Sequence, residues 1–162
     1  MVRINVSQQL KESMGSVRSY KVSDYVEIDG VEMPLEGDLK LTRTDKGLLA
    51  EAKLRAELEL TCSRCLGSFT TPLLVDIEEE YFPRINIVTG ANLPLPDEPG
   101  CFTIDEHNML DLTEAIRQYA LISLPVKPLC REDCAGLCPT CGCNLNEVTC
   151  ACPPPLDPAG QC

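Results

Sequence analysis

The chain has 162 residues, with 14 Lys and Arg against 25 Asp and Glu, and its formal net charge is −11. Because this surplus of negative charge repels phosphate, it excludes a protein that binds DNA or anionic membranes through bulk charge. Only 4% of the residues are aromatic, which also excludes a protein that stacks bases on rows of rings. The chain has no apolar run of about 20 residues and no export-signal pattern, so we expect a soluble, cytoplasmic protein.

The first predicted elements are strands. Weak extended signals cover residues 3–6 and 17–28, and a hairpin is predicted for residues 36–61, with a Gly-ended turn at residues 44–47. In its second strand, residues 48–60, Leu or Ala alternates with mostly polar residues. Helical winding would scatter these apolar positions, so the period of two outweighs the helix-favouring composition.

Further strand signals follow the hairpin. Residues 69–77 alternate again and predict a third antiparallel strand, which a short turn at residues 62–67 joins to the second. Residues 83–100 contain four Pro and two Gly, so we predict a long irregular connection. A short edge strand is expected at residues 101–104.

One helix is predicted after these strands. Asp111, followed by Glu114, fits an N-cap with a capping box, and Pro125 ends the helix. Its apolar face is predicted to consist of Leu112, Ala115, Ile116, Tyr119, Ala120 and Ile122.

These elements predict an α+β fold, mainly antiparallel β, with a twisted or barrel-like sheet and one packed helix. We expect this domain at residues 1–129, a Cys-rich zinc-binding segment docked on it at residues 130–152, and a disordered tail at residues 153–162.

The 11 cysteines are the main functional signal. In a reducing compartment, spaced cysteines favour metal ligation over disulfides. The one histidine, His107, stands far from every pair, so any site must be built from thiolates. The four spaced pairs are Cys62 and Cys65, Cys130 and Cys134, Cys138 and Cys141, and Cys150 and Cys152.

Zinc prefers four such ligands in a tetrahedron, so the pairs predict one or two structural zinc ions. The preferred partition joins Cys62 and Cys65 with Cys130 and Cys134, and leaves Cys138, Cys141, Cys150 and Cys152 for a second site. Two partitions stay open beside it: a single site of Cys130, Cys134, Cys138 and Cys141, or a second site in which Cys143 replaces Cys150 or Cys152. Each four-thiolate site adds about −2, so two filled sites would take the charge from −11 to about −15.

An enzyme is the second hypothesis. Arg64 lies between Cys62 and Cys65 and would lower a thiol pKa, as a dithiol-disulfide oxidoreductase needs. However, strand pattern continues on both sides of this pair, whereas thioredoxin-like pairs open a helix. Glu78–Glu80 is interpreted as a solvated acidic run, and no catalytic residues are assigned.

The basic residues also leave two interpretations open. They gather in the hairpin region and form either a solvated mixed-charge face, which we favour, or a local contact with RNA or a ribosomal protein. The residues concerned are Lys40, Arg43, Lys46, Lys53, Arg55 and Arg64.

Several motifs occur together in one order. They are Leu60–Leu66 (LTCSRCL), Ile104–Leu112 before the predicted helix, Leu124–Pro128 (LPVKP) at its end, Leu129–Gly142 (LCREDCAGLCPTCG), and Asn144-Leu145-Asn146. From about residue 36 to 152 the chain resembles the YceD family, the large ribosomal RNA subunit accumulation proteins.

The resemblance implies a cytoplasmic bacterial factor that supports accumulation of large-subunit ribosomal RNA, and hence ribosome assembly. The partner would be ribosomal RNA or a basic ribosomal protein, without DNA or a membrane. The resemblance supplies neither a molecular mechanism nor an oligomeric state.

Overall fold

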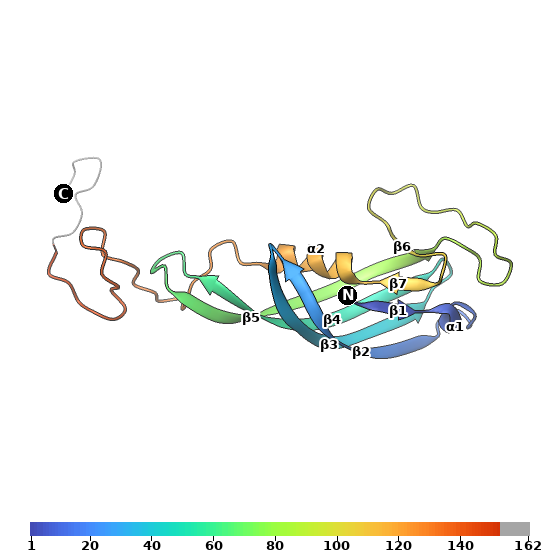
Figure 1. Cartoon of the computed structure of the whole chain (residues 1–162), viewed down its shortest axis with the longest axis horizontal. Coiled ribbons are helices and arrows are strands. Elements are labelled where there is room, and N and C mark those ends of the chain that lie inside the picture. The colour runs from blue at the N-terminus through green and yellow to red at the C-terminus, as the bar shows by residue number, and fades with distance from the viewer. Residues whose placement is uncertain (153–162) are drawn as a thin grey trace. The chain divides into compact units, whose positions relative to one another are not determined.

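The computed structural model describes residues 1–152 (Figure 1); the tail predicted for residues 153–162 lies outside them. The elements, in chain order, are β1 (Arg3–Asn5), α1 (Ser7–Leu10), β2 (Val17–Ile28), β3 (Val31–Arg43), β4 (Leu48–Thr61), β5 (Ser68–Pro83), β6 (Phe102–Ile104), β7 (Met109–Asp111) and α2 (Thr113–Ser123). Neither helix within the described range has the length and apolarity that crossing a membrane would take.

The strands form two sheets. The larger has the order β2-β3-β4-β5-β6, and the smaller pairs β1 with β7. Strands β2, β3 and β4 are antiparallel neighbours, and β6 adds to β5 in parallel as the expected short edge strand. The predicted fold class is confirmed: the protein is mainly antiparallel β, with a curled sheet and a packed helix.

Tight turns set the register of the antiparallel strands. Asp29 and Gly30 join β2 to β3 and have φ values of 52° and 80°, the paired positive angles of a two-residue type I′ hairpin turn. In the predicted turn between β3 and β4, the Thr44 backbone N–H donates to the Gly47 carbonyl at 2.9 Å. The first strand of the predicted hairpin is longer than expected, because it begins at Val31 rather than at residue 36.

Alternation in β4 places its apolar residues in the core, as predicted. Leu48 and Ala50 are fully buried, whereas Lys53 and Arg55 are exposed. Gly37 of β3 lets this strand approach β4 closely, since a Cβ there would lie 2.1 Å from the Lys53 carbonyl oxygen.

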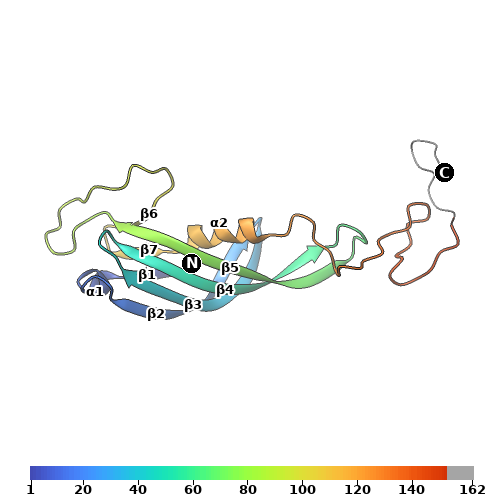
Figure 2. The same ribbon diagram turned by 180° about the vertical axis from the view of Figure 1, so that it is seen from behind.

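Helix α2 packs against the larger sheet (Figure 2). It contacts β2, and the Tyr119 hydroxyl donates to the Glu78 carbonyl of β5 at 3.3 Å. Because β2 and β5 are separated by two strands, contact with both is consistent with a sheet that curls around the helix.

Two details of the helix prediction are wrong. The N-cap is Leu112 rather than Asp111, and Glu114 accepts hydrogen bonds from Arg117 and Gln118, so no capping box forms. Asp111 instead accepts from the Thr113 backbone N–H at 2.9 Å.

The predicted apolar face of the helix is wrong at one position. Ile122 is 80% exposed, because at about 100° per residue it lies opposite the buried Ala120.

The chain divides into two compact units. The first contains residues 1–57 and 72–124, with the curled sheet and α2. The second contains residues 58–71, which are the end of β4, the turn and the start of β5, together with the Cys-rich chain over the described residues 125–152. All eight predicted metal-ligating cysteines belong to the second unit.

Candidate metal centres

Two short turns with the same backbone geometry present the first cysteines. In the first knuckle, Cys62–Gly67, the Cys62 N–H donates to the Gly67 carbonyl at 2.8 Å, and the Leu66 N–H donates to the Cys62 carbonyl at 2.9 Å. The fifth residue, Leu66, has a left-handed φ of 60°. Leu66, and not the glycine that follows it, is therefore the residue with the unusual conformation in this turn.

The second knuckle, Cys138–Cys143, repeats this pattern. The Cys138 N–H donates to the Cys143 carbonyl at 2.8 Å, and the Gly142 N–H donates to the Cys138 carbonyl at 2.8 Å. Gly142 has a φ of 77° and occupies the position of Leu66. Each knuckle therefore holds a Cys-x2-Cys pair in one local conformation.

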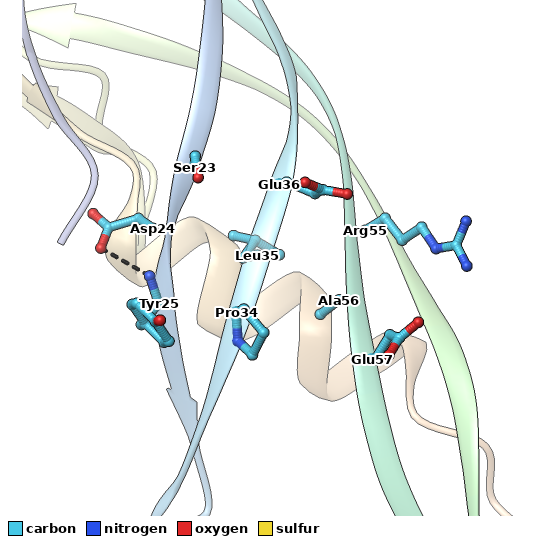
Figure 3. A pocket seen from close by; sticks show the side chains of 9 residues that line it. All are labelled: Ser23, Asp24, Tyr25, Pro34, Leu35, Glu36, Arg55, Ala56 and Glu57. Carbon is cyan, nitrogen blue, oxygen red and sulfur yellow. Dashed lines mark hydrogen bonds between the residues drawn. The ribbon is translucent and has the colours of Figure 1, made fainter.

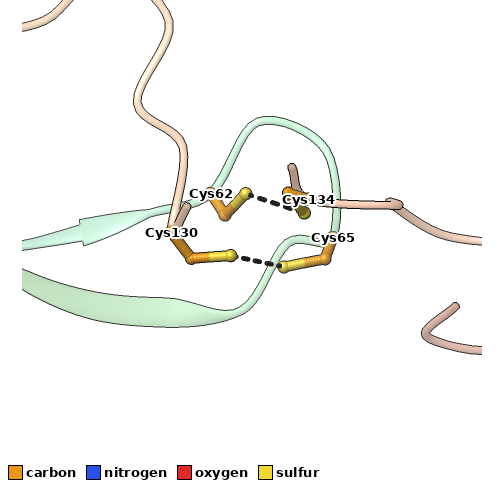
Figure 4. A group of neighbouring side chains, drawn as sticks. All are labelled: Cys62, Cys65, Cys130 and Cys134. Atoms are coloured by element: carbon orange, nitrogen blue, oxygen red, sulfur yellow. Dashed lines mark hydrogen bonds between the residues drawn. The ribbon is translucent and has the colours of Figure 1, made fainter. Parts of the chain in front are cut away.

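The first knuckle meets the segment that follows α2, and together they form the first cluster (Figure 4). The Sγ atoms of Cys62 and Cys134 lie 3.7 Å apart, and those of Cys65 and Cys130 lie 3.8 Å apart. Four sulfurs bound tetrahedrally to zinc at ~2.3 Å would be separated by ~3.8 Å. The donor set and its spacing thus fit a four-thiolate metal site.

The second cluster consists of Cys138, Cys141, Cys150 and Cys152, whose sulfurs lie within 4.8 Å of one another, as do those of the first cluster. The two clusters are those of the preferred partition, rather than the single site of Cys130, Cys134, Cys138 and Cys141. Cys143 supplies the carbonyl that closes the second knuckle and belongs to neither cluster. Cys101 lies in the first unit, outside both.

Backbone N–H groups favour the thiolate form of the leading cysteine in each knuckle. The Cys65 N–H is the largest cause that lowers the pKa of Cys62 to about 6, and the Cys141 N–H is the largest cause that lowers the pKa of Cys138 to about 6. Conversely, desolvation is the largest cause that raises the pKa of Cys130, to about 12. Thiolates are the form of cysteine that binds metal, so a bound metal ion would displace the thiol protons that lie between these sulfurs.

Several contacts hold the first cluster together. The Ser63 N–H donates to the Pro128 carbonyl at 2.8 Å, and the Arg64 guanidinium donates to the Cys134 carbonyl at 3.1 Å. Phe69, Leu129 and Leu137 pack against the buried Cys62, Cys65 and Cys134. Arg64, which suggested a reactive thiol in the sequence, is thus directed to backbone carbonyls.

Sequence reasoning missed the amide side chains beside this cluster. Asn146 donates from Nδ2 to the Cys134 Sγ at 3.3 Å, and its own backbone N–H donates to Asn144 Oδ1 at 3.0 Å. The Asn144-Leu145-Asn146 motif was the available signal, but spacing alone does not connect it with a cysteine that precedes it by ten positions or more.

A hollow in the face of the larger sheet shows no comparable chemistry. A hollow of about 510 Å³ lies across β2, β3 and β4, and Figure 3 shows the Arg55 side chain directed away from Asp24 and Tyr25. Asp24 accepts from the Tyr25 backbone N–H and from the N-terminal amine, so it is already occupied. Within residues 1–152, no hydrogen bond joins a nucleophile to a base among the residues that line this hollow.

The basic residues that we considered for RNA contact are partly engaged within the protein. Lys40 pairs with Glu51, and Arg43 donates to the carbonyls of Thr44 and Gly47. Lys53 and Arg55 remain exposed on the sheet face.

Among the comparisons with known proteins, one family model matches the chain. The profile described as "Large ribosomal RNA subunit accumulation protein YceD" matches residues 50–159, a range that includes both clusters. An uncharacterised protein of Mycobacterium tuberculosis is 28% identical over an alignment of 127 positions, which covers 72% of this chain and 61% of that relative. One of Mycobacterium leprae is 26% identical over an alignment of 113 positions, which covers 69% of this chain and 49% of the relative.

The chain therefore spans at most about three fifths of the length of these curated relatives. No solved structure matches it significantly.

Proposed function

Because this chain belongs to the YceD family, we propose that it is a non-catalytic factor that supports large-subunit ribosomal RNA accumulation, and thereby ribosome assembly, in the cytoplasm. The family match carries the proposal, since it extends over residues 50–159 and includes every cysteine of both clusters. No membrane or DNA is part of the proposed role.

Structural zinc completes the proposal. The ligands would be Cys62, Cys65, Cys130 and Cys134 at the first cluster, and Cys138, Cys141, Cys150 and Cys152 at the second. Four thiolates leave no open position on a tetrahedral ion, which is typical of structural sites and not of catalytic ones. Bound zinc would supply cross-links between chain segments, and the first cluster would fasten the β4–β5 turn to the Cys-rich segment.

The net negative charge of the chain favours one class of binding partner over the other. The chain carries −11, and two filled four-thiolate sites would bring it to about −15. A basic ribosomal protein segment matches this charge, whereas ribosomal RNA could bind only at a local basic surface such as that around Lys53 and Arg55. Binding assays with ribosomal RNA and with a basic ribosomal protein, at several salt concentrations, separate these partners.

Depletion in the native host tests the function. We expect fewer mature large subunits and less large-subunit ribosomal RNA on sucrose gradients, with rescue by the wild-type chain and by Cys101→Ser. Cys62→Ser combined with Cys134→Ser should rescue poorly. Unchanged large-subunit RNA after depletion, without co-migration of the protein with precursors, would refute the proposal.

A dithiol-disulfide oxidoreductase is the alternative, and it is favoured by the backbone N–H groups that lower the pKa of Cys62 and Cys138 to about 6. An insulin-reduction assay separates the two functions. Turnover that depends on Cys62 and Cys65, in protein that holds no metal, would support the enzyme. If the Cys→Ser variants lose their folded structure and the wild type shows no insulin-reduction turnover, the result would support structural zinc.

A further inference from the structure

Asn146 connects the two cysteine clusters. In the chain it lies between Cys141 and Cys150, both members of the second cluster, yet its side chain contacts the first. Its Nδ2 donates to the Cys134 Sγ at 3.3 Å. Its Oδ1 accepts from the Ala135 backbone N–H at 2.8 Å and from the Arg131 guanidinium at 2.6 Å.

The partners of the amide determine its orientation. A backbone N–H and a guanidinium can only donate, so the amide oxygen must face Ala135 and Arg131, and the amide nitrogen must face Cys134. Asn144 holds this orientation, because its Oδ1 accepts from both the backbone N–H and Nδ2 of Asn146, at 3.0 and 2.9 Å. The hydrogen bond to sulfur therefore stabilises the thiolate form that binds metal.

The loop that carries Asn146 is fixed at its base to the segment joining the clusters. Leu137 and Asn144 form an antiparallel bridge, and the Leu145 N–H donates to the Gly136 carbonyl at 2.9 Å. A metal at the second cluster would link Cys141 to Cys150 and so close the eight-residue stretch 142–149 around Asn146. Closing a short loop lowers the entropy that is lost when its side chains are held in place.

We infer that Asn146 is a positioning residue that couples the two metal centres: metal at the second cluster orders the 142–149 loop, which delivers an N–H···S hydrogen bond to Cys134 and strengthens metal binding at the first. The inference rests on the structural zinc of the proposed function and adds the way in which its two ions depend on each other. Coupling of this kind is reciprocal, so metal at the first cluster strengthens the second by the same factor.

Outer-shell partners of metal ligands are worth ~10–100-fold in metal affinity. We therefore expect Asn146→Ala to weaken zinc binding at the first cluster ~10–100-fold. Asn146→Asp keeps the acceptor that faces Ala135 and Arg131 but cannot donate to Cys134 when ionised, so it should weaken the same cluster at least as much. Glu147→Ala, an exposed neighbour in the same loop, is the matched control and should leave affinity unchanged.

The experiment uses the full chain, with zinc as the probe and a competing chelator to measure affinity. Cadmium NMR of cadmium-loaded protein reports each cluster by its own signal, assigned through Cys→Ser variants. Metal retained at the second cluster of Asn146→Ala shows that the unit is folded, so weaker binding at the first cannot then be attributed to unfolding.

A second arm removes the second centre with Cys150→Ser and Cys152→Ser together. We expect ~10-fold weaker zinc binding at the first cluster, and little further loss when Asn146→Ala is added, because coupled effects are not additive. Unchanged first-cluster affinity in all these variants, with two zinc ions bound by the wild-type chain, would overturn the coupling and leave structural zinc intact. A wild-type chain without metal would overturn both.

Discussion

The two knuckles allow a matched test of backbone conformation at the metal centres. Gly142 and Leu66 occupy the same position, with φ values of 77° and 60°. A Cβ added to Gly142 would meet nothing within 4 Å, so Gly142→Ala changes the conformational energy alone. Holding an L-residue in the left-handed region costs ~1–2 kcal/mol, partly offset by the ~0.4–1 kcal/mol that alanine gains over glycine through the unfolded chain.

The net cost is about 1 kcal/mol, or ~5-fold in an equilibrium constant. If the knuckle takes this conformation to bind metal, Gly142→Ala should weaken zinc binding at the second cluster by that factor. Chelator competition followed by zinc analysis measures it. Leu66→Gly should change first-cluster affinity by less than ~2-fold, because relief of strain offsets the added chain entropy and the loss of a side chain that is already 64% exposed.

Gly67→Ala is the control. Gly67 has no positive φ, and a Cβ there would lie 3.4 Å from the Cys65 Sγ, an ordinary contact distance, so affinity should stay within ~2-fold of wild type. Unchanged zinc affinity in Gly142→Ala, or a ~5-fold loss in Leu66→Gly, would refute the assignment of strain to this position.

Three further predictions concern pH, the sheet and the isolated thiol. In the metal-free chain, the depressed pKa of Cys62 and Cys138 gives stability that is present above the ordinary thiol pKa and is lost as pH falls through about 6, so zinc affinity measured by chelator competition should fall more steeply with pH below ~6 than above it. Gly37→Ala would place a Cβ 2.1 Å from the Lys53 carbonyl oxygen and should destabilise the sheet by ~1–3 kcal/mol in urea unfolding, whereas wild-type stability would contradict the close approach. Cys101→Ser should leave the zinc content unchanged by elemental analysis, because Cys101 belongs to neither cluster.

Much of the sheet could be predicted from hydrophobic alternation. The pattern of β4 identified a half-buried strand despite helix-favouring composition, because burial of one face outweighs intrinsic propensity. The weak extended signal predicted at residues 3–6 matches β1, but β7 has three residues and is too short to carry a period, so the pairing of β1 with β7 could not be predicted. Ile122 was predicted to lie on the apolar face of the helix, but its side chain is exposed. An apolar residue in a helix therefore need not belong to the buried face.

The sequence by itself determined the chemistry of the candidate sites. Eleven cysteines and a single histidine made thiolate the donor, and short spacings defined the pairs, because one turn can present two sulfurs to one ion. The tertiary structure decided which pairs meet: the first cluster joins Cys65 to Cys130, 65 positions apart, and the path of the chain between them determines that contact. It also decided that Asn146 reaches Cys134, since a side-chain hydrogen bond depends on where two segments lie in space and not on their separation in sequence.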